Sequence, residues 1–512
     1  MARYRADLIE TAWAVENSYG TRATTLDGGW GIVNAGITLP DPRYEITPFY
    51  GLGVDDRNLM SYIQGREVFE GAVGTVMLCH DASRLILGDS IGQIFNATPV
   101  LDDVASCTVG ADSVVVTGGD TAAGGSSIGV TAGATPTHIV VISQTNVSGS
   151  VNPYTSTFAY IGASISGSHT FQVHHSMNTT AATDLGWQGK IGLTTCRASV
   201  YSIARSKIAA NNGTAGVLAS DTMSHTGSVG IRETLKQNSF TLGSKITADN
   251  GQALTTNYMG NKIGSIGFNF AENSPVTFNI SFTGQDMIHN MPGGTAATIL
   301  KYGTVTAPTM QQITEQPYYF SRANLKFGGV TFAKFRTLTI NIANQLDPRY
   351  YVTQGSNTDN RMVLSEILEG RRAISIGGQL DMDDTGATAA SGAQNGPDIK
   401  MLQYLFNQGF NTASSDPRDM SAAANMIGVS LEIELRRFAD GSGPTYDTIT
   451  LKLPADDTLS GTNPGLILTA ARMPVPAPPQ VHQNLDLEGF ARSISCLLYT
   501  SDAADDTPWV DL

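Results

Sequence analysis

Charged side chains are scarce in this sequence of 512 residues, in which Asp, Glu, Lys and Arg together make up 15%. Neither lysine nor arginine occurs between Val100 and Gly189. The formal net charge of −14 means that carboxylates outnumber the basic groups. Affinity for nucleic-acid phosphates comes from clustered Lys and Arg, so this composition argues against an ordinary nucleic-acid-binding protein.

Cysteine is also rare, and its four positions are Cys79, Cys107, Cys196 and Cys496. These residues lie far apart along the chain and form no C-x-x-C pair. The spacing argues against a zinc or redox motif and against the dense disulfide framework of a small secreted domain. We therefore expect isolated thiols, most of them buried.

Long apolar runs are missing as well. No stretch approaches the ~18 consecutive apolar residues of a membrane span. The first residues, MARYRADLIETAWAVE, carry charges throughout and lack the apolar centre of a secretory signal. We expect a chain made in the cytoplasm, without membrane contact, that leaves this compartment only as part of an assembly.

The common catalytic and cofactor motifs do not occur. The sequence has no phosphate-binding G-x-x-x-x-G-K-[ST], no H-E-x-x-H and no dinucleotide fingerprint. Ser127 lies in a G-x-S-x-G match over residues 125–129, but Gly/Thr-rich loops flank it instead of the strand and helix of a nucleophile elbow. We expect no catalytic residue and no cofactor.

Possible metal ligands form incomplete sets. His169, His174 and His175 lie close together, but strand alternation sends His174 and His175 to opposite faces. Residues 381–386 and 484–489 begin like calcium loops, yet neither has the glutamate that such a loop needs at its twelfth position. We interpret the histidines as surface or interface residues and both segments as turns, and we expect no metal site.

Glycine and hydrophobic residues, in contrast, are plentiful. The 54 glycines and a hydrophobic content of 41%, with many Ser, Thr and Asn, are typical of a globular chain built from short strands and turns. The length implies two or three compact units or one domain with large insertions. This composition favours a mainly β fold.

One stretch shows the strand pattern most clearly. In IGFNFAENSPVTFNISFTG, residues 266–284, the large apolar side chains all fall on even positions. This alternation predicts a hairpin with a buried apolar face and an uncharged wet face of Asn, Ser and Thr. Because an isolated hairpin is only marginally stable in water, a partner for it is implied.

Similar alternation recurs in residues 324–347, 371–384, 429–438 and 447–456. Residues 398–408 instead carry an apolar stripe at helical spacing, between Pro397 and Gly409, and residues 85–96 also read as a short helix. The side chains expected in the core are Leu325, Phe327, Leu338, Ile340, Ile342, Ile374, Ile376, Leu431, Ile433 and Leu435.

Two segments differ in character from the rest. Residues 100–226 are rich in Gly, Ser and Thr, and their Val and Ile residues come in strand-length groups, which favours an inserted β domain over a disordered linker. Residues 496–512 begin with CLLYTSDAAD, which resembles the translation of a sequencing-library adaptor. We therefore interpret this tail as a cloning or assembly scar and exclude it from fold reasoning.

Several segments follow one another in a recognisable order. The order is NYMGNKIGSIGFNFAENSPVTFNISFTGQDM (257–287), EQPYYFSRANLKFGG (315–329), FRTLTINIANQLDPRYYV (335–352), ILEGRRAISIGGQLDM (367–382), the helix near Leu402, and then SLEIELRRF and DTITLKLPAD. This order resembles that of the tail tube proteins of long-tailed, siphovirus-like bacteriophages. The resemblance covers roughly residues 230–457 and, more loosely, the first hundred residues.

The resemblance implies a mainly β subunit of tail-tube type: an antiparallel β-sandwich or barrel with one packed α-helix and an inserted β-rich domain. Such subunits close into six-fold rings, which stack into a conduit for DNA ejection. The chain would divide into an N-terminal part of the tube module (1–99), an inserted domain (100–226), the main β module with helix 398–408 (227–473), an extended C-terminal segment (474–495) and the adaptor-derived tail (496–512). The implied partners are further copies of the chain, a tape-measure protein, and tail terminator and initiator proteins. DNA would pass through the lumen of the virion tail without specific binding.

The wet faces of two predicted hairpins are candidates for the lining of that lumen. The candidate lumen-facing residues are Asn269, Glu272, Thr277, Asn279, Ser281, Thr283, Thr337, Thr339 and Asn341. Alternation defines two faces without saying which is inside, so an outer wall or a joint between rings stays open for these residues.

Two other classes of protein also stay open. One is a different β-rich virion component, such as a baseplate hub or capsid protein. The other is a carbohydrate-binding or adhesive β-domain protein, which the Gly/Ser/Thr-rich insertion suggests. An enzyme ranks third, because only Ser127 supports it.

Overall fold

The architecture is described from a computed structural model of the chain. The residues that the structure describes are 4–16, 19–26, 28–30, 32–33, 36–50, 59–96, 101–109, 113–117, 138–144, 156–164, 170–174, 196–202, 229–233, 237–290, 301–309, 316–327, 330–332, 335–350, 364–381, 431–438, 446–453, 466–472, 484–491 and 495–499. No helix among these residues is long and apolar enough to cross a membrane.

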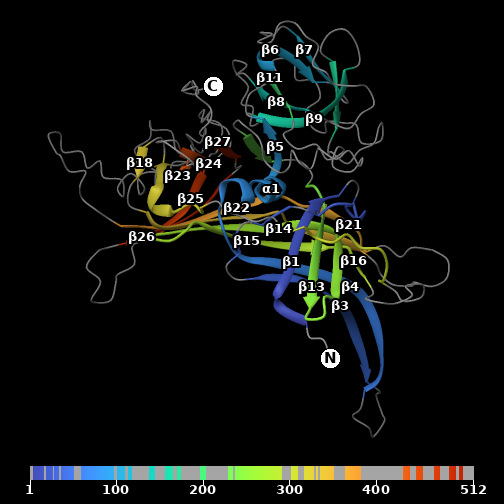
Figure 1. Cartoon of the computed structure of the whole chain (residues 1–512). Helices are drawn as coiled ribbons and strands as arrows, with labels where there is room; N and C mark the ends of the chain where they lie inside the picture. Colours follow the sequence, from blue (N-terminus) through green and yellow to red (C-terminus); the bar gives the residue numbers. More distant parts are fainter. Residues whose placement is uncertain are drawn as a thin grey trace, which may run out of the picture.

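A 12-stranded antiparallel sheet, here the main sheet, forms the base of the molecule (Figure 1). Its central path runs through β2 (Ile32–Val33), β4 (Leu59–Met77), β15 (Thr277–Gly284), β14 (Ala253–Ala271), β19 (Phe335–Ala343), β22 (Ala373–Asp381), β26 (Asn484–Ala491) and β25 (Leu466–Arg472). Four strands branch from this path: β1 (Tyr4–Val15), β13 (Phe240–Ala248), β16 (Asp286–His289) and β3 (Ile37–Tyr50).

Strand β14 connects the two halves of the main sheet. Its first half pairs with β13 and β16, whereas its second half pairs with β15 and β19. Register shifts in these pairings lie near Gly260 and Gly264. Gly260 has a φ of +66°, and a Cβ there would stand 2.6 Å from the Cβ of Gln285, so both the backbone angle and the space favour glycine.

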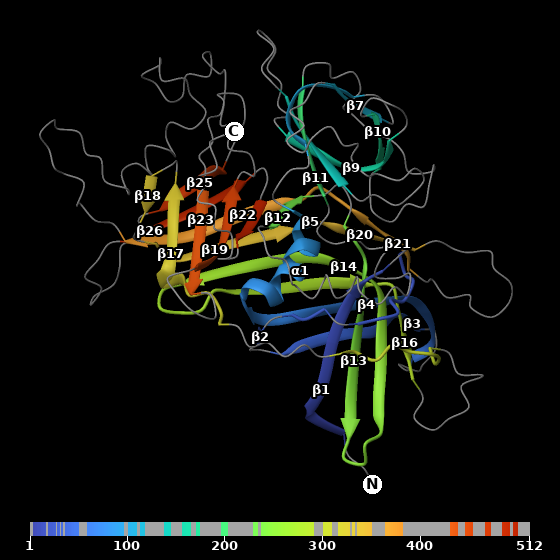
Figure 2. The same cartoon turned by 45° about the horizontal axis from the view of Figure 1, so that its top comes forward.

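A second, 7-stranded sheet covers the apolar side of the main sheet. Its order is β18 (Val330–Phe332), β17 (Ala323–Phe327), β23 (Leu431–Phe438), β24 (Tyr446–Leu453), β27 (Ser495–Tyr499), β12 (Val229–Glu233) and β5 (Gly92–Asn96). The helix α1 (His80–Ile91) lies between β14 and β5 (Figure 2), where its Ile86, Leu87 and Ile91 are fully buried. The fold is thus a β-sandwich with a packed helix at one end.

The core between the two sheets is one continuous hydrophobic cluster. Phe268, Phe270, Phe278 and Ile340 of the main sheet belong to it together with Ile433 of the second sheet. Nine of the ten predicted core residues are buried, and the side chain of the tenth, Phe327, lies outside the described residues. The alternation in the sequence therefore predicted the buried face correctly.

A closed barrel follows β5 in the chain and rises above the two sheets in Figure 1. It consists of β6 (Leu101–Val109), β7 (Ser113–Thr117), β8 (His138–Gln144), β9 (Ser156–Ser164), β10 (Thr170–His174) and β11 (Cys196–Ser202). Strands β5 and β12, which flank it in the sequence, pair with each other. The barrel is therefore inserted between two neighbouring strands of the second sheet.

The barrel also brings two cysteines together. Cys107 of β6 and Cys196 of β11 are directly opposite partners in the antiparallel register. We expected four isolated thiols, and for this pair that expectation is wrong. Distance along the chain cannot reveal that the first and last strands of a barrel are neighbours.

Other local expectations need correction. Residues 484–489 are part of strand β26 and not a turn. The helix expected over residues 85–96 runs instead from His80 to Ile91, after which β5 begins. The helix expected at 398–408, Ser127, His169 and His175 all lie outside the described residues.

The tail that we excluded from fold reasoning has a place in the structure. Strand β27 contains Cys496 to Tyr499 and lies between β24 and β12 in the second sheet. Its pairing describes a position in the fold, while the origin of residues 496–512 stays a prediction.

Candidate functional site: the polar face of the main sheet

The residues proposed for a lumen come together on three adjacent strands of the main sheet. Asn269 of β14 is opposite Thr277 of β15 on one side and Thr339 of β19 on the other. One row further, Gly267 lies between Asn279 and Asn341. Asn269, Asn279, Thr339 and Asn341 are exposed, while their apolar neighbours in the sequence are buried. We call this surface the polar face.

Two of the candidates lie at the margins of the polar face. Thr283, at the end of β15, is opposite Glu70 of β4 and Lys262 of β14. Glu272 lies in the turn between β14 and β15 and is exposed, with its backbone N–H donating to the carbonyl of Arg336 at 2.9 Å. Thr277, Ser281 and Thr337 complete the nine candidates on β15 and β19.

Polar groups on this face bond to one another across the strands. The hydroxyls of Ser265 and Ser281 are 2.7 Å apart. The Thr339 hydroxyl donates to the carbonyl of Gly377 on β22 at 3.1 Å. Such local partners reduce the number of donors and acceptors that a passing molecule could bind.

Gly267 lies opposite Asn279 and adds no side chain to the polar face. A Cβ at Gly267 would stand 2.4 Å from Oδ1 of Asn279, so the asparagine side chain lies across the space that a larger residue would fill. The surface at this point is formed by an amide and by backbone, without charge or apolar bulk.

The polar face extends onto two strands that sequence reasoning did not include. Gln379 of β22 donates to Asp486 of β26 at 3.0 Å, and Glu488 of β26 is opposite Gly377. Arg472 of β25 forms an exposed ion pair with Glu488 at 3.1 Å. The alternating pattern of NLDLEGFA could have revealed β26, but we interpreted the carboxylates there as part of a turn.

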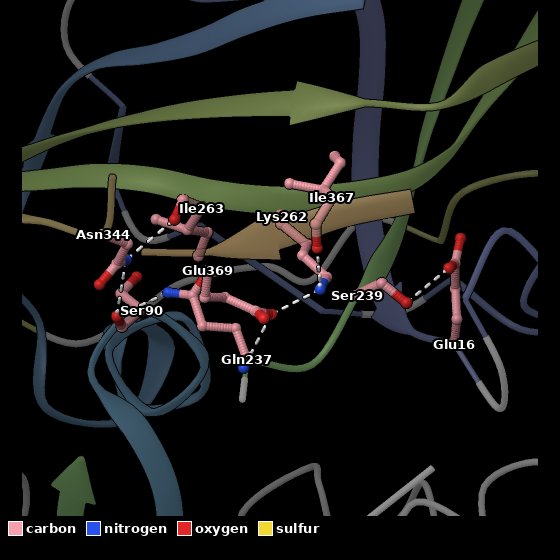
Figure 3. A network of polar contacts seen from close by, with 9 residues as sticks. All are labelled: Glu16, Ser90, Gln237, Ser239, Lys262, Ile263, Asn344, Ile367 and Glu369. Carbon is pink, nitrogen blue, oxygen red and sulfur yellow. Dashed lines mark hydrogen bonds and ion pairs between the residues drawn. The ribbon is translucent and has the colours of Figure 1, made fainter. Parts of the chain in front are cut away.

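A buried polar network stabilises one end of the main sheet (Figure 3). Nζ of Lys262 lies 2.5 Å from the Glu369 carboxylate of β21 (Leu364–Glu369) and donates to the carbonyl of Ile367 at 2.8 Å. Asn344 donates to the carbonyl of Ile263 at 2.9 Å. These contacts tie β21 and the end of β19 to β14, so they position the polar face and do not form part of it.

Glu16 is the most buried carboxylate of this network. Its two oxygens accept from the backbone N–H groups of Gly20 and Gly260 and from the hydroxyls of Ser239 and Thr241, at 2.7–2.9 Å. Burial raises the pKa of Glu16 above its ordinary value of 4.5, although all four hydrogen bonds oppose that rise. The four donors offset part of the cost of removing a carboxylate from water.

A second surface differs strongly from the polar face. Beyond the body of the main sheet, β3 and β4 project as a two-stranded arm, at the lower right of Figure 1, and among the described residues they pair there only with each other. Large apolar side chains on this arm are exposed: Ile46 59%, Tyr50 67%, Tyr62 62% and Ile63 60%. At its base, Arg66 pairs with Glu45 at 2.7 Å and lies over the ring of Tyr350.

Among the residues with described placement, no group of three or more His, Cys, Asp or Glu gathers as a metal site would require. A small cavity between the sheets has a mainly apolar lining that includes Phe335 and Leu338, together with Glu488. In the part of the chain that the structure describes, the polar face is an open surface of polar side chains on neighbouring strands.

Comparison with known proteins agrees with the order of segments in the sequence. A family model described as phage tail tube protein matches residues 140–435, which is more than half of the chain. The match begins within β8 of the barrel, includes all of β9 to β22 and ends within β23. Curated protein sequences gave no match. The chain belongs to the phage tail tube protein family.

Proposed function

We propose that this chain is a tube subunit that assembles into stacked rings, six subunits to a ring, whose bore conducts DNA during ejection. The observation that carries the proposal is the polar face. It is a broad surface of Asn, Ser, Thr and Gly on neighbouring strands, with carboxylates at its margins. Membership in the tail tube family supports a structural role in the virion.

The chemistry of the polar face suits a bore through which DNA slides. Phosphates bind to clustered lysine and arginine, whereas neutral or acidic walls hold them weakly or repel them. Asp486, Glu488 and Glu70 lie beside the uncharged centre, and the arginine near Glu488 is paired with it. Asn269, Thr277, Asn279, Ser281, Thr283, Thr337, Thr339 and Asn341 would face the lumen, with Glu272 at one rim.

The arm provides the contact between copies in this proposal. Exposed aliphatic and aromatic side chains on a projecting ribbon indicate a protein partner, because a two-stranded ribbon is barely stable alone in water. Strand β3 contains Pro40, Pro42 and Pro48, which lack a backbone N–H, so its outer edge is a poor template for adding a strand. We therefore expect the side chains of the arm, more than its backbone, to bind a second copy of the chain.

Ring closure would use the opposite margin of the sheet. Within the described part of the chain, β25 pairs only with β26, so one of its edges is left for a neighbouring copy. An unpaired strand edge promotes aggregation of a monomer. In a closed ring each such edge can hydrogen-bond to a neighbouring subunit. The tape-measure protein and the tail terminator and initiator proteins are the further partners that we propose from family membership.

The barrel between β5 and β12 would decorate the outside of the tube. Its strands close on one another, so its backbone offers no edge for ring formation. Insertion between two paired strands allows the barrel to stand apart from the sheets that would form the conduit.

Negative-stain electron microscopy of the full chain tests the assembly. We expect tubes or stacked rings with a central bore. Closed shells would favour a capsid protein, and isolated single rings would favour a baseplate hub. A monomer that stays monodisperse at high concentration, with and without tail initiator protein, would contradict the proposal.

A further inference from the structure

We propose that Cys107 and Cys196 form a disulfide that joins the first and last strands of the barrel. Cys107 lies in β6 and Cys196 in β11, and the two are directly opposite partners in the antiparallel register. Opposite residues in an antiparallel pair have Cα atoms about 4.5 or 5.5 Å apart. Both spacings fall within the range of about 4.4–6.8 Å that disulfides span.

The pairing is specific within the described residues. The neighbour of Cys107 on its other side is Val116, and that of Cys196 is Gln144. Cys79 is fully buried beside α1 in the main body, and Cys496 lies opposite Ile231 and Leu451 in the second sheet. Within the described residues, the register therefore makes Cys107 and Cys196 each other's only cysteine neighbour.

The position of the bond gives it a structural effect. Strands β6 and β11 carry the chain into and out of the barrel, and they are neighbours in the closed order of strands. A covalent link between them closes nearly the whole barrel sequence into one loop. Long loops lose the most unfolded-state entropy on cross-linking, so this link would hold the barrel closed.

The bond forms by thiol–disulfide exchange with a small disulfide such as oxidised glutathione. One cysteine thiolate attacks a sulfur of the small disulfide and releases one glutathione thiolate, which leaves a mixed disulfide on the protein. The second cysteine thiolate then attacks the protein sulfur of that mixed disulfide and releases the second glutathione. Two protein thiols are oxidised, one small disulfide is reduced, and the two protons pass to the released thiolates.

The timing of oxidation rests on the virion location that we propose. A bacterial cytosol keeps thiols reduced, whereas released particles meet oxidising surroundings. The barrel would then fold in its reduced form and acquire its cross-link after the virion leaves the cell. The bond itself does not depend on tube formation, so its test is separate from the test of the proposed function.

Peptide mapping of the purified full chain tests the bond. After exposure to oxidised glutathione, free thiols are blocked with N-ethylmaleimide under denaturing conditions, and the chain is cut before Asp and after Lys and Arg. We expect DVASCTVGA, residues 103–111, to be linked to IGLTTCR, residues 191–197, with Cys79 recovered as its maleimide adduct. Recovery of Cys107 and Cys196 as two maleimide adducts would overturn the proposal, as would linkage of either one to another cysteine.

Variants give the second readout. In Cys107→Ser, we expect Cys196 to stop at the mixed disulfide with glutathione, and Cys196→Ser should leave Cys107 in the same state. Limited thermolysin digestion of the barrel should be about tenfold slower or more in the oxidised chain than in the reduced chain. The double serine variant should show equal rates with and without oxidant, and an equal rate for oxidised and reduced wild type would contradict the stapling role.

Discussion

The polar face and the β3–β4 arm are both open to solvent, but their chemistry is opposite. On the polar face, hydroxyls and amides contact one another across β14, β15 and β19, and the exposed large apolar side chain of Phe490 lies on β26, away from these three strands. On the arm, Ile46, Tyr50, Tyr62 and Ile63 are more than half exposed. The polar face has few groups that would bind a partner strongly. Burial of the apolar side chains of the arm against a partner would be favourable in free energy.

The difference shows how one sheet can serve two tasks. Strand β4 contributes to both surfaces, because its C-terminal half pairs with β15, whereas its N-terminal half pairs only with β3 among the strands that the structure describes. In the proposed tube, the N-terminal half of β4 would contact another copy, and its C-terminal half would lie beside the lining of the bore.

The largest effect should come from placing charge on the arm. We expect the double variant Ile46→Asp, Ile63→Asp to raise the concentration needed for tube formation by about 100-fold or more, since burying each side chain is worth about 1.5–3 kcal/mol. Light scattering and electron microscopy would measure assembly, and circular dichroism would check folding. The matched control is Thr337→Asp, Thr339→Asp on the polar face, and loss of assembly in that control would remove the contrast.

The next effect compares the two faces of β15. Phe278 is buried in the core between the sheets, while Asn279 beside it is exposed. We expect Phe278→Ala to lower the free energy of unfolding by about 3–5 kcal/mol. Asn279→Ala should change it by no more than about 0.5 kcal/mol. Urea unfolding measures both, and similar values for the two variants would show that the register of β15 is wrong.

A smaller effect is expected from the ion pair beneath the sheet. Lys262 and Glu369 are largely buried, so Lys262→Met leaves a carboxylate without its cation and should lower the free energy of unfolding by about 2–4 kcal/mol. Arg472→Met removes an exposed ion pair with Glu488 and should cost about 1 kcal/mol or less. Equal costs in urea unfolding would argue against the support that we assign to the network.

The smallest effect concerns pH. Burial raises the pKa of Glu16 in the folded state above 4.5, so the folded chain holds this proton more tightly than the unfolded chain does. The contribution of Glu16 is therefore most favourable below about pH 4.5 and is lost as the pH rises through the raised folded pKa. The difference in unfolding free energy between wild type and Glu16→Gln should fall across that window. A difference that increases with pH would show that the four donors lower the pKa instead.

Part of this structure could be predicted from the sequence because its cause is local. The alternation in residues 266–284 requires a hairpin with one apolar face, and the structure pairs Phe268 with Phe278 as such a hairpin must. The polar candidates on β14, β15 and β19 follow from the same rule. The family, too, could be identified from the order of such segments.

Long-range features could not be predicted in this way. The sequence around Lys262 does not indicate that Glu369 is its ion-pair partner. The sequence around Cys107 does not indicate that Cys196 lies opposite it in the barrel. Strand β26 was missed for a different reason. The spacing of Asp486 and Glu488 is typical of a turn, and only the pairing with β22 shows that these residues lie in a strand. Pairing between distant strands decides each of these cases, and one sequence does not contain that information in a readable form.

We expect the polar face to line the bore of the assembled tube. The most direct measurement compares Asn341→Cys on the polar face with Arg436→Cys on the exposed side of the second sheet, using a maleimide too bulky to enter the tube. We predict that both cysteines react in the monomer and that assembly protects only the cysteine at position 341. Equal labelling of both cysteines in intact tubes, or protection of position 436 alone, would contradict the account.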